Sequence, residues 1–263
     1  MLRFPMLRVP SVFLLGRILA VVLAVLGTAR MGVGVLAWRA ANGLERPSYT
    51  VLQRLDYGVE LRRYSRYLVA ETRVKAGATE GSTRSGGMNA GTGVGFRRVA
   101  GYIFGKNKPK ARLAVSQPEG QASEGQASKG PRGEKMAMTA PVRTATPGDG
   151  SARVSFVMEK AYNRRTAPAP LDSSVRLKDI APHILAARRF SGPPPSDKRI
   201  AKEKSRILQA LDAAGLKAQT SGAESDTLIY GYHDPFITPN FLRRNEVCVR
   251  VAETAELRAK EGP

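Results

Sequence analysis

The chain has 263 residues, a length that suits one large domain or two small ones. It carries 42 Lys and Arg residues against 22 Asp and Glu residues, a formal net charge of +20, and 42% of its residues are hydrophobic, enough for a core. Such a charge favours phosphates, anionic lipid headgroups or carboxylates as partners, although an Arg-rich proteome would produce the same excess.

The distribution of charge and the cysteine content exclude several classes of protein. The basic residues are spread along the whole chain and no stretch has the pattern of a recognition helix, so we expect no nucleic-acid partner. The single cysteine, Cys248, rules out a disulfide within the chain, and its alternating surroundings predict a small apolar residue of a strand rather than a nucleophile. Without a CxxC, an HExxH or a histidine cluster, no structural zinc site is expected.

Residues 1–46 have the composition of a targeting or membrane segment rather than of a folded domain. Val12 to Ala37 is mostly apolar, and its longest uninterrupted run is Ile18 to Ala29. That run is shorter than the roughly 20 residues of a spanning helix but within the range of a signal peptide. Small residues at Gly27 to Ala29 favour cleavage, whereas the apolar continuation to Trp38 favours a retained anchor. We therefore predict export, with an organellar transit peptide as the alternative.

Pro47 marks the start of the folded domain, which opens with strands. Tyr49–Leu52 has the composition of a strand, and Val59–Tyr64 and Tyr67–Val74 alternate between apolar and polar residues, as half-buried strands do. A stretch rich in Gly, Ser and Thr follows at about 75–95, and we predict a flexible loop there.

A short helix is predicted over Phe96–Phe104. Its apolar residues recur at helical spacing, and Gly105 is placed to end it. The next segment, about 106–134, is polar and contains a tandem Glu-Gly-Gln-Ala-Ser repeat, so we predict a disordered insertion. Met136–Val142 then returns to extended chain, and Arg153–Glu159 alternates as a strand.

The second half of the domain repeats this order of elements. It contains predicted strands, a helix capped by Ser196 and two closing strands, over Val175–Ile180, Ile184–Phe190, Asp197–Ala214, Leu228–Tyr232 and Glu246–Val251. Neither half has enough strands to close alone. We therefore predict an α+β fold in which the two halves pair their sheets into one barrel-like structure with two helices outside, followed by a charged C-terminal tail at 253–263.

The residue types that usually carry catalysis form no recognisable constellation. His233 lies in a Tyr-His-Asp-Pro turn, His183 begins a strand, and neither is near a nucleophile motif. The Gly105–Lys106 pair ends a helix rather than beginning one, so it cannot direct backbone N–H groups at a phosphate. This profile favours ligand binding over catalysis, and we expect no catalytic residues.

Seven short segments form a combination that is more specific than any one of them. They are Tyr49 to Val51, Val59 to Tyr64, Phe96 to Asn107, Glu134 to Val142, Arg189 to Gly192, Tyr232 to Pro235 and Arg243 to Val247. Together these segments, which extend over about 47–252, resemble the SOUL/haem-binding protein family.

The resemblance implies a fold, a ligand and a site. The fold would be a distorted eight-stranded antiparallel β-barrel of duplicated strand–helix–strand units with two packed helices. The ligand would be haem or a related tetrapyrrole on a largely apolar surface near the first helix, with basic side chains for its propionates. On this chain the corresponding residues are Arg97, Arg98, Val99, Ile103, Phe104 and Lys106.

The resemblance leaves the axial iron ligand open among the two histidines, Met136, Met138 and Tyr102. The N-terminal segment resembles that of bacterial, exported members of the family. This likeness implies either a periplasmic protein or one anchored in the inner membrane and facing the periplasm.

Three functions follow as hypotheses. The first is non-catalytic binding of haem or a related tetrapyrrole, as a carrier or buffer. The second is an envelope-associated interaction protein that keeps the fold without binding haem, with its basic surface turned to anionic lipid or a protein partner. The third is an enzyme acting on a tetrapyrrole, for example through an acid–base pair such as Tyr64 with Glu60.

Overall fold

The computed structural model describes residues 12–75, 88–110, 133–146, 151–219, 227–254 and 257. The tandem repeat and most of the two predicted loops lie outside these residues. The predicted loop at 75–95 needs one correction, because helix α2 begins at Met88. Its glycines do not break the helix. At Gly95 a Cβ would come within 2.7 Å of the Val154 side chain, so the missing side chain lets α2 approach the sheet closely.

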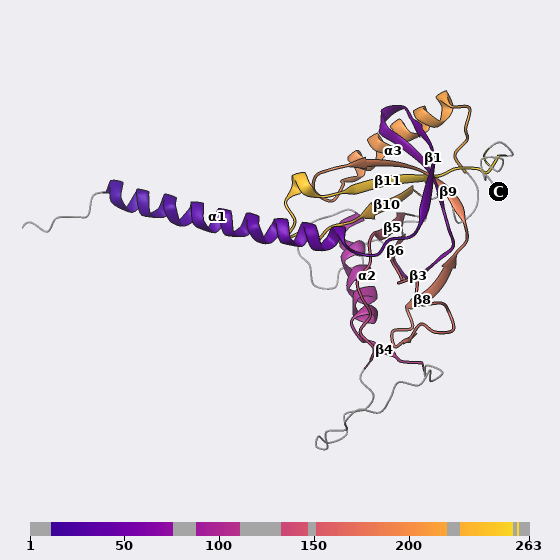
Figure 1. The fold of residues 1–263 in the computed structure, drawn as a ribbon, viewed down its shortest axis with the longest axis horizontal. Helices are drawn as coiled ribbons and strands as arrows, with labels where there is room; N and C mark the ends of the chain where they lie inside the picture. The colour runs from indigo at the N-terminus through magenta and orange to yellow at the C-terminus, as the bar shows by residue number, and fades with distance from the viewer. Residues whose placement is uncertain are drawn as a thin grey trace, which may run out of the picture.

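The N-terminal segment forms one long helix, α1, from Val12 to Asn42. Among the described residues, Gly16–Asn42 is the one helical stretch long and apolar enough to cross a membrane, a property that signal sequences share. Residues 16–33 are exposed, although Arg30 and Met31 line a groove with the connection between β10 and β11, and the helix packs closely on the domain at Gly34. Figure 1 shows α1 projecting away from the domain as a single rod.

Within the described residues, nine antiparallel strands form one curled sheet (Figure 1). They are β1 (Tyr49–Leu55), β2 (Val59–Tyr64), β3 (Tyr67–Lys75), β5 (Val142–Thr146), β6 (Ser151–Val157), β8 (Val175–Ile180), β9 (His183–Phe190), β10 (Thr227–Gly231) and β11 (Asn245–Arg250). Their order across the sheet is β1-β2-β9-β11-β10-β5-β6-β3-β8. A separate short ladder pairs β4 (Asn107–Lys108) with β7 (Ala169–Pro170), and 3-10 turns lie at Asp56–Gly58 and Asn240–Leu242.

The strand order has an internal symmetry that agrees with the predicted duplication. Outward from the central pair, one half runs β10, β11, β9, β2 and the other runs β5, β6, β3, β8. In the chain, the first repeat is β2, β3, α2 (Met88–Ile103), β5 and β6, and the second is β8, β9, α3 (Asp197–Ala213), β10 and β11. Each half of the sheet therefore takes its outer strand, β2 or β8, from the other repeat. The antiparallel pairing of β5 with β10 joins the halves.

The sheet is a half-barrel, so the expectation of a closed eight-stranded barrel is wrong. β1 is a ninth strand that pairs with the outer side of β2 through the Asp56–Gly58 turn, in which Tyr57 and Gly58 both adopt positive φ. A strand has only two sides for pairing, and β2 uses its other side for β9. β2 therefore cannot close the barrel onto β8, and β1 and β8 are the two edges.

Both α2 and α3 pack on the same face of the sheet. Directly opposed residues of antiparallel strands share a face, and the register pairs Val154 with Thr144, Thr144 with Ile229, and Ile229 with Val247. Val154 belongs to the core under α2, and Val247 belongs to the core under α3. As predicted, Ser196 caps α3 by accepting from the Arg199 N–H, and Gly105, at φ 110, follows the end of α2.

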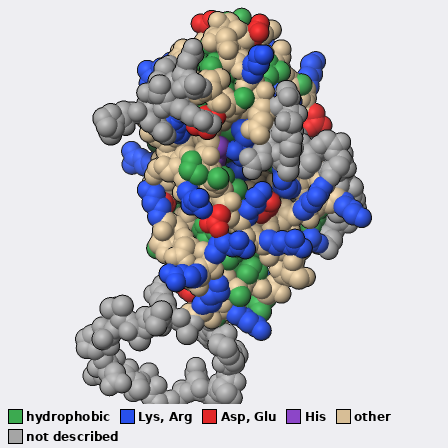
Figure 2. Space-filling view, turned by 90° about the vertical axis from the view of Figure 1, so that its right-hand side faces the viewer, with side chains coloured by type: hydrophobic (Ala, Val, Ile, Leu, Met, Phe, Trp, Pro, Cys, Tyr) green, Lys and Arg blue, Asp and Glu red, His purple; other side chains and the backbone are tan. Residues whose placement is uncertain are grey.

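The opposite face of the sheet buries aromatic and polar side chains. Arg143 lies within cation–π distance of Tyr67 (5.4 Å) and Tyr230 (5.7 Å). Cys248 is fully buried on this face beside Tyr230, which confirms that it fills space in a strand. The surface outside the core is basic. On the side turned away from α1, Lys and Arg side chains are scattered rather than gathered in one patch (Figure 2).

His183 is a buried titratable group of this face whose pKa is shifted by folding. Its ring stacks on Tyr64 at 5.4 Å with an interplanar angle of 7°, and its Nδ1 lies 2.8 Å from the Ala181 carbonyl oxygen, to which it donates. Burial lowers the pKa of His183 to about 4, against the opposing effect of the Ala181 hydrogen bond and with the help of Arg250 and Arg143. The imidazole is therefore neutral in the folded protein near pH 7.

We predict that His183 makes folding stability depend on pH between about 6.5 and 4. Below pH 6.5 the unfolded chain protonates this histidine while the folded chain does not, so stability is lost as pH falls through this window. The loss amounts to about 2–3 kcal/mol by pH 4.5. Denaturant unfolding at pH 7 and 4.5 measures it. His183→Phe, which keeps the aromatic ring, should remove that part of the pH dependence; an unchanged dependence would contradict the prediction.

Candidate functional site

An apolar cleft of about 370 Å³ lies over the central β5–β10 pair. Its floor is formed by Val142 and Thr144 of β5 and by Ile229 and Gly231 of β10. The cleft exists because α2 packs over β3 and β6, and α3 packs over β9 and β11, which leaves the shared central strands without a covering helix. Its volume is within the range of small-molecule sites, at the lower end.

Small or absent side chains keep the cleft open. Gly231 lines it, and a Cβ on Gly231 would meet no atom within 4 Å. The last turns of α1 contribute Ala37, Ala40 and Ala41 to one wall. Phe96 of α2 supplies the aromatic wall, with its ring 5.1 Å from that of Phe156 in the core. A flat apolar ligand would therefore find apolar contacts on several sides.

His233 brings a polar group to one end of the cleft. Its Nδ1 accepts a hydrogen bond from the Arg244 backbone N–H at 3.0 Å, so the neutral ring carries its proton on Nε2. Nε2 is buried and has no hydrogen-bond partner among the described residues. In this arrangement His233 offers a hydrogen-bond donor to a ligand oxygen. It does not offer the lone pair that iron would need.

The surroundings of His233 are electropositive. Burial lowers the pKa of His233, and Arg46, Arg244 and Arg189 lower it further by charge repulsion. The neighbouring acid, Asp234, accepts from the Phe236 and Ile237 backbone N–H groups at 2.7 and 2.8 Å, which confirms the predicted turn. This end of the cleft therefore suits a carboxylate.

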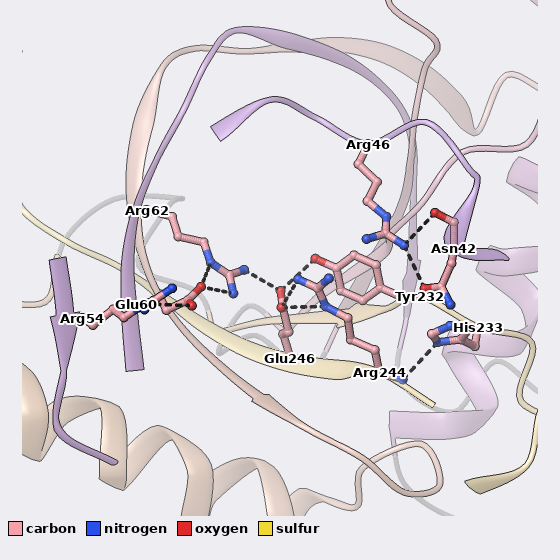
Figure 3. Close-up of polar contacts among 9 residues, drawn as sticks. All are labelled: Asn42, Arg46, Arg54, Glu60, Arg62, Tyr232, His233, Arg244 and Glu246. Carbon is pink, nitrogen blue, oxygen red and sulfur yellow. Dashed lines mark hydrogen bonds and ion pairs between the residues drawn. The ribbon is translucent and has the colours of Figure 1, made fainter. Parts of the chain in front are cut away.

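A buried network holds this end of the cleft in place (Figure 3). Glu246 is fully buried and accepts from Arg62 Nη1 at 2.9 Å, from Arg244 Nη2 at 2.7 Å and from the Tyr232 hydroxyl at 2.8 Å. Burial by itself would raise the pKa of Glu246, but Arg62 and Arg244 bring the pKa below its usual value. The carboxylate is therefore ionised, and it orients Tyr232, which lines the cleft.

Tyr232 also lies close to two cations. The guanidinium carbon of Arg244 is 4.2 Å from the Tyr232 ring centroid, and that of Arg46 is 5.3 Å from it. Arg46 donates to the Asn42 carbonyl and side-chain oxygens at 3.4 and 3.3 Å, while its Nε has no hydrogen-bond partner among the described residues. Arg46 does not line the cleft, so it contributes to this end through its positive charge behind Tyr232.

The six residues expected from the family resemblance lie elsewhere on α2 and after it, and none of them lines the cleft. Val99 and Ile103 are buried in the core between α2 and the sheet, at 0% and 2% exposure, so they do not face a surface ligand. Arg97, Phe104 and Lys106 are exposed and Arg98 is partly buried. α2 reaches the cleft instead through Thr92 and Phe96.

The acid–base pair considered for catalysis is not assembled. Glu60 pairs with Arg62, at 2.8 Å between the Glu60 carboxylate and Arg62 Nη2, whereas the Tyr64 hydroxyl is buried without a hydrogen-bond partner among the described residues. Burial raises the pKa of Tyr64 well above its usual value, which makes it a poor acid. Within the described part of the chain, no group of three His, Cys, Asp or Glu side chains is placed to hold a metal ion.

Sequence reasoning missed both the residues that line the cleft and the charged residues behind its polar end. Arg46 was assigned to the leader, and Glu246 reads as one polar residue of an alternating strand. One signal was available for Glu246: a buried strand that carries a charge next to two arginines predicts an ion pair. Gly231 and the alanines of α1 carry no signal of their own, because a cavity depends on what surrounds them.

The comparison with known families now decides the assignment. Residues 44–130 and 124–250 match the family model described as SOUL heme-binding protein. The chain belongs to the SOUL family. This membership confirms the resemblance stated above and supports haem or a related tetrapyrrole as the ligand class. None of the curated proteins compared with this SOUL-family chain matches it.

Several solved structures share part of the backbone arrangement. A hydrolase from Listeria innocua is 9% identical and aligns over 74% of this chain and 91% of its own, with a TM-score of 0.46. The EcmrR C-terminal domain is 9% identical over 78% and 99% of the two chains, with a TM-score of 0.46. SAV2435 bound to tetraphenylphosphonium is 10% identical over 77% and 99%, with a TM-score of 0.38. These values transfer neither a ligand nor an activity to the SOUL-family chain.

We predict that Glu246→Gln lowers the free energy of unfolding by about 3 kcal/mol, because it leaves Arg244 without its counter-charge and the buried Arg62 with only the partly exposed Glu60. The control is Glu60→Gln, which removes a partly exposed partner of the same Arg62 and should cost less than about 1 kcal/mol. Urea unfolding of the two variants measures the difference. Equal losses would show that the buried Glu246 stabilises the fold no more than the partly exposed Glu60 does.

Proposed function

We propose that this chain binds haem or a related tetrapyrrole without catalysis, in the cleft over β5 and β10. The observation that supports the proposal is the combination of an apolar cleft with an electropositive end, in a chain of a family described as haem-binding. A tetrapyrrole needs both features, because it has an apolar macrocycle and carries carboxylates.

The residues present fit the two parts of such a ligand. Phe96, Ile229 and the α1 alanines would cover the macrocycle, while the Nε2–H of His233 would bind a propionate and Arg46, which lies on Tyr232 outside the cleft lining, would add positive charge at that end. Because the Nδ1 of His233 already accepts a hydrogen bond, we propose this residue as a propionate partner rather than an iron ligand. The exposed cations Arg97 and Lys106 on and after α2 are the second location for propionates, as the family resemblance implies.

The role that follows is that of a carrier or buffer in the bacterial envelope. We propose that the chain is exported and that α1 either remains as an inner-membrane anchor or is cleaved, with the domain in the periplasm. Cleavage after Ala29 would leave Ala37 to Leu44, and with them the α1 wall of the cleft, in place. An interaction protein that has lost haem binding is the alternative if no ligand enters the cleft.

We predict that Gly231→Phe weakens hemin binding about tenfold or more, because it places a ring in open space inside the cleft. The full-length protein in detergent is titrated with hemin and followed by Soret absorbance, with thermal unfolding as a check on folding. The matched comparison is the double variant Arg97→Ala/Arg98→Ala on α2. Loss of affinity in this variant alone would move the site to the surface of α2. No saturable binding in the parent protein would favour the interaction-protein alternative.

We predict that Arg46→Gln weakens hemin binding severalfold, since Arg46 adds positive charge behind Tyr232 and His233 at the propionate end of the cleft. Hemin dimethyl ester, which lacks the carboxylates, should bind both forms equally. Parallel Soret titrations with the two ligands measure this difference. An equal loss for the ester would mean that Arg46 supports the fold of the cleft rather than the propionate.

A further inference from the structure

The connection between β10 and β11 exposes large apolar side chains to solvent. Phe236 is 81% exposed, Phe241 is 65% exposed and Ile237 is 48% exposed. Three such side chains within six residues form an exposed apolar patch, and such patches mark sites of interaction with a protein or a membrane. The backbone here is ordered by Asp234 and by the 3-10 turn Asn240–Leu242, so the patch is presented by a defined turn.

This loop packs against α1 where the helix leaves the domain. At Gly34 of α1 a Cβ would come within 2.6 Å of Pro239, so the missing side chain lets the loop lie directly on the helix. Nearby, Arg30 and Met31 of α1 line a groove of about 190 Å³ together with Phe236, Ile237 and Arg243 of the loop. Figure 1 shows this connection, in yellow, on the side from which α1 emerges.

The position of the loop along α1 explains how the helix can contain Arg30 and still span a bilayer. A charge in the middle of an apolar helix is costly in hydrocarbon, but Arg30 lies at the height of the loop rather than at the centre of the free part of the helix. The roughly 18 residues from Val12 to Ala29 span about 27 Å as a helix, close to the thickness of a bilayer core. With that stretch in hydrocarbon, Arg30 and Arg243 reach the headgroups, and Arg17 is near enough to the far end to extend toward water.

We propose that Phe236, Ile237 and Phe241 lie in the interface of the lipid bilayer that α1 spans, with Arg30 and Arg243 among the anionic headgroups. Aromatic and basic side chains are the types that bind this interface. The proposal rests on the anchor form of the proposed function. It gives the exposed patch one partner, the bilayer, because the patch continues the apolar surface of α1 rather than lying apart from it.

The exposed loop is continuous with the polar end of the cleft. His233, Asp234 and Pro235 line the cleft and lead directly into Phe236. A loop seated in the interface therefore places this end of the cleft beside the membrane surface. An apolar tetrapyrrole dissolved in the bilayer would enter the cleft without crossing water.

Tryptophan quenching by brominated phosphatidylcholine tests the position of the loop in the full-length protein reconstituted in vesicles. The sole tryptophan is first removed by Trp38→Phe. A reporter is then introduced by Phe236→Trp, by Val25→Trp within α1, or by Leu171→Trp, an exposed apolar position next to β7, which pairs with β4 away from α1 (Figure 1). We expect lipid brominated near the headgroup to quench Phe236→Trp strongly. Lipid brominated deeper in the acyl chains should quench Val25→Trp, and neither lipid should quench Leu171→Trp.

The Phe236→Trp reporter decides the proposal. Its quenching supports the loop position, and an unquenched reporter overturns it, whatever Val25→Trp reports about the anchor.

A second experiment separates the membrane contact of the loop from haem binding itself. Phe236→Ser/Phe241→Ser should slow hemin uptake from vesicles severalfold and leave hemin affinity in detergent unchanged. Unchanged uptake would overturn the membrane route, whereas lost affinity in detergent would assign the two rings to the binding site.

Discussion

The pairing of β5 with β10 is the contact on which the architecture depends. Each half of the sheet has a helix over two of its outer strands, and the halves of the sheet meet through one strand from each, while β2 and β8 pair across the two repeats of the chain. The joint is therefore the part of the sheet that no helix of either half covers. A cleft at this position is a geometric consequence of the duplication, and Gly231 and the alanines of α1 keep it open.

Positive charge distinguishes one end of the cleft from the other. The chain is strongly basic, yet most of that charge is scattered over the surface and selects no particular ligand. At the His233 end, by contrast, Arg46, Arg189 and Arg244 act together on one partly buried ring. Glu246 neutralises part of this charge and is ionised because two guanidinium groups and a tyrosine hydroxyl replace its water. Such a carboxylate stabilises the fold only while its partners stay in place.

The N-terminal helix α1 is partly a free apolar helix and partly a wall of the cleft. Residues 16–33 of the helix are exposed, whereas its last turns form a wall of the cleft and Gly34 packs against the β10–β11 loop. A membrane anchor attached through a flexible linker would leave the orientation of the domain open. Here the helix continues into the domain, so an inserted α1 would fix which side of the cleft approaches the lipid.

The sequence by itself determined the local elements and the family. Alternation and helical spacing predicted most of the strands and both helices of the domain, because each pattern reflects one buried face, and Ser196 and Gly105 marked helix ends for local backbone reasons. The half-barrel and the cleft were decided only in the tertiary structure. Closure depended on which side of β2 the first strand occupied, and Val99 and Ile103 proved to be core because α2 turns them toward the sheet. A cavity is defined by atoms that are absent between distant segments, and no single segment encodes that absence.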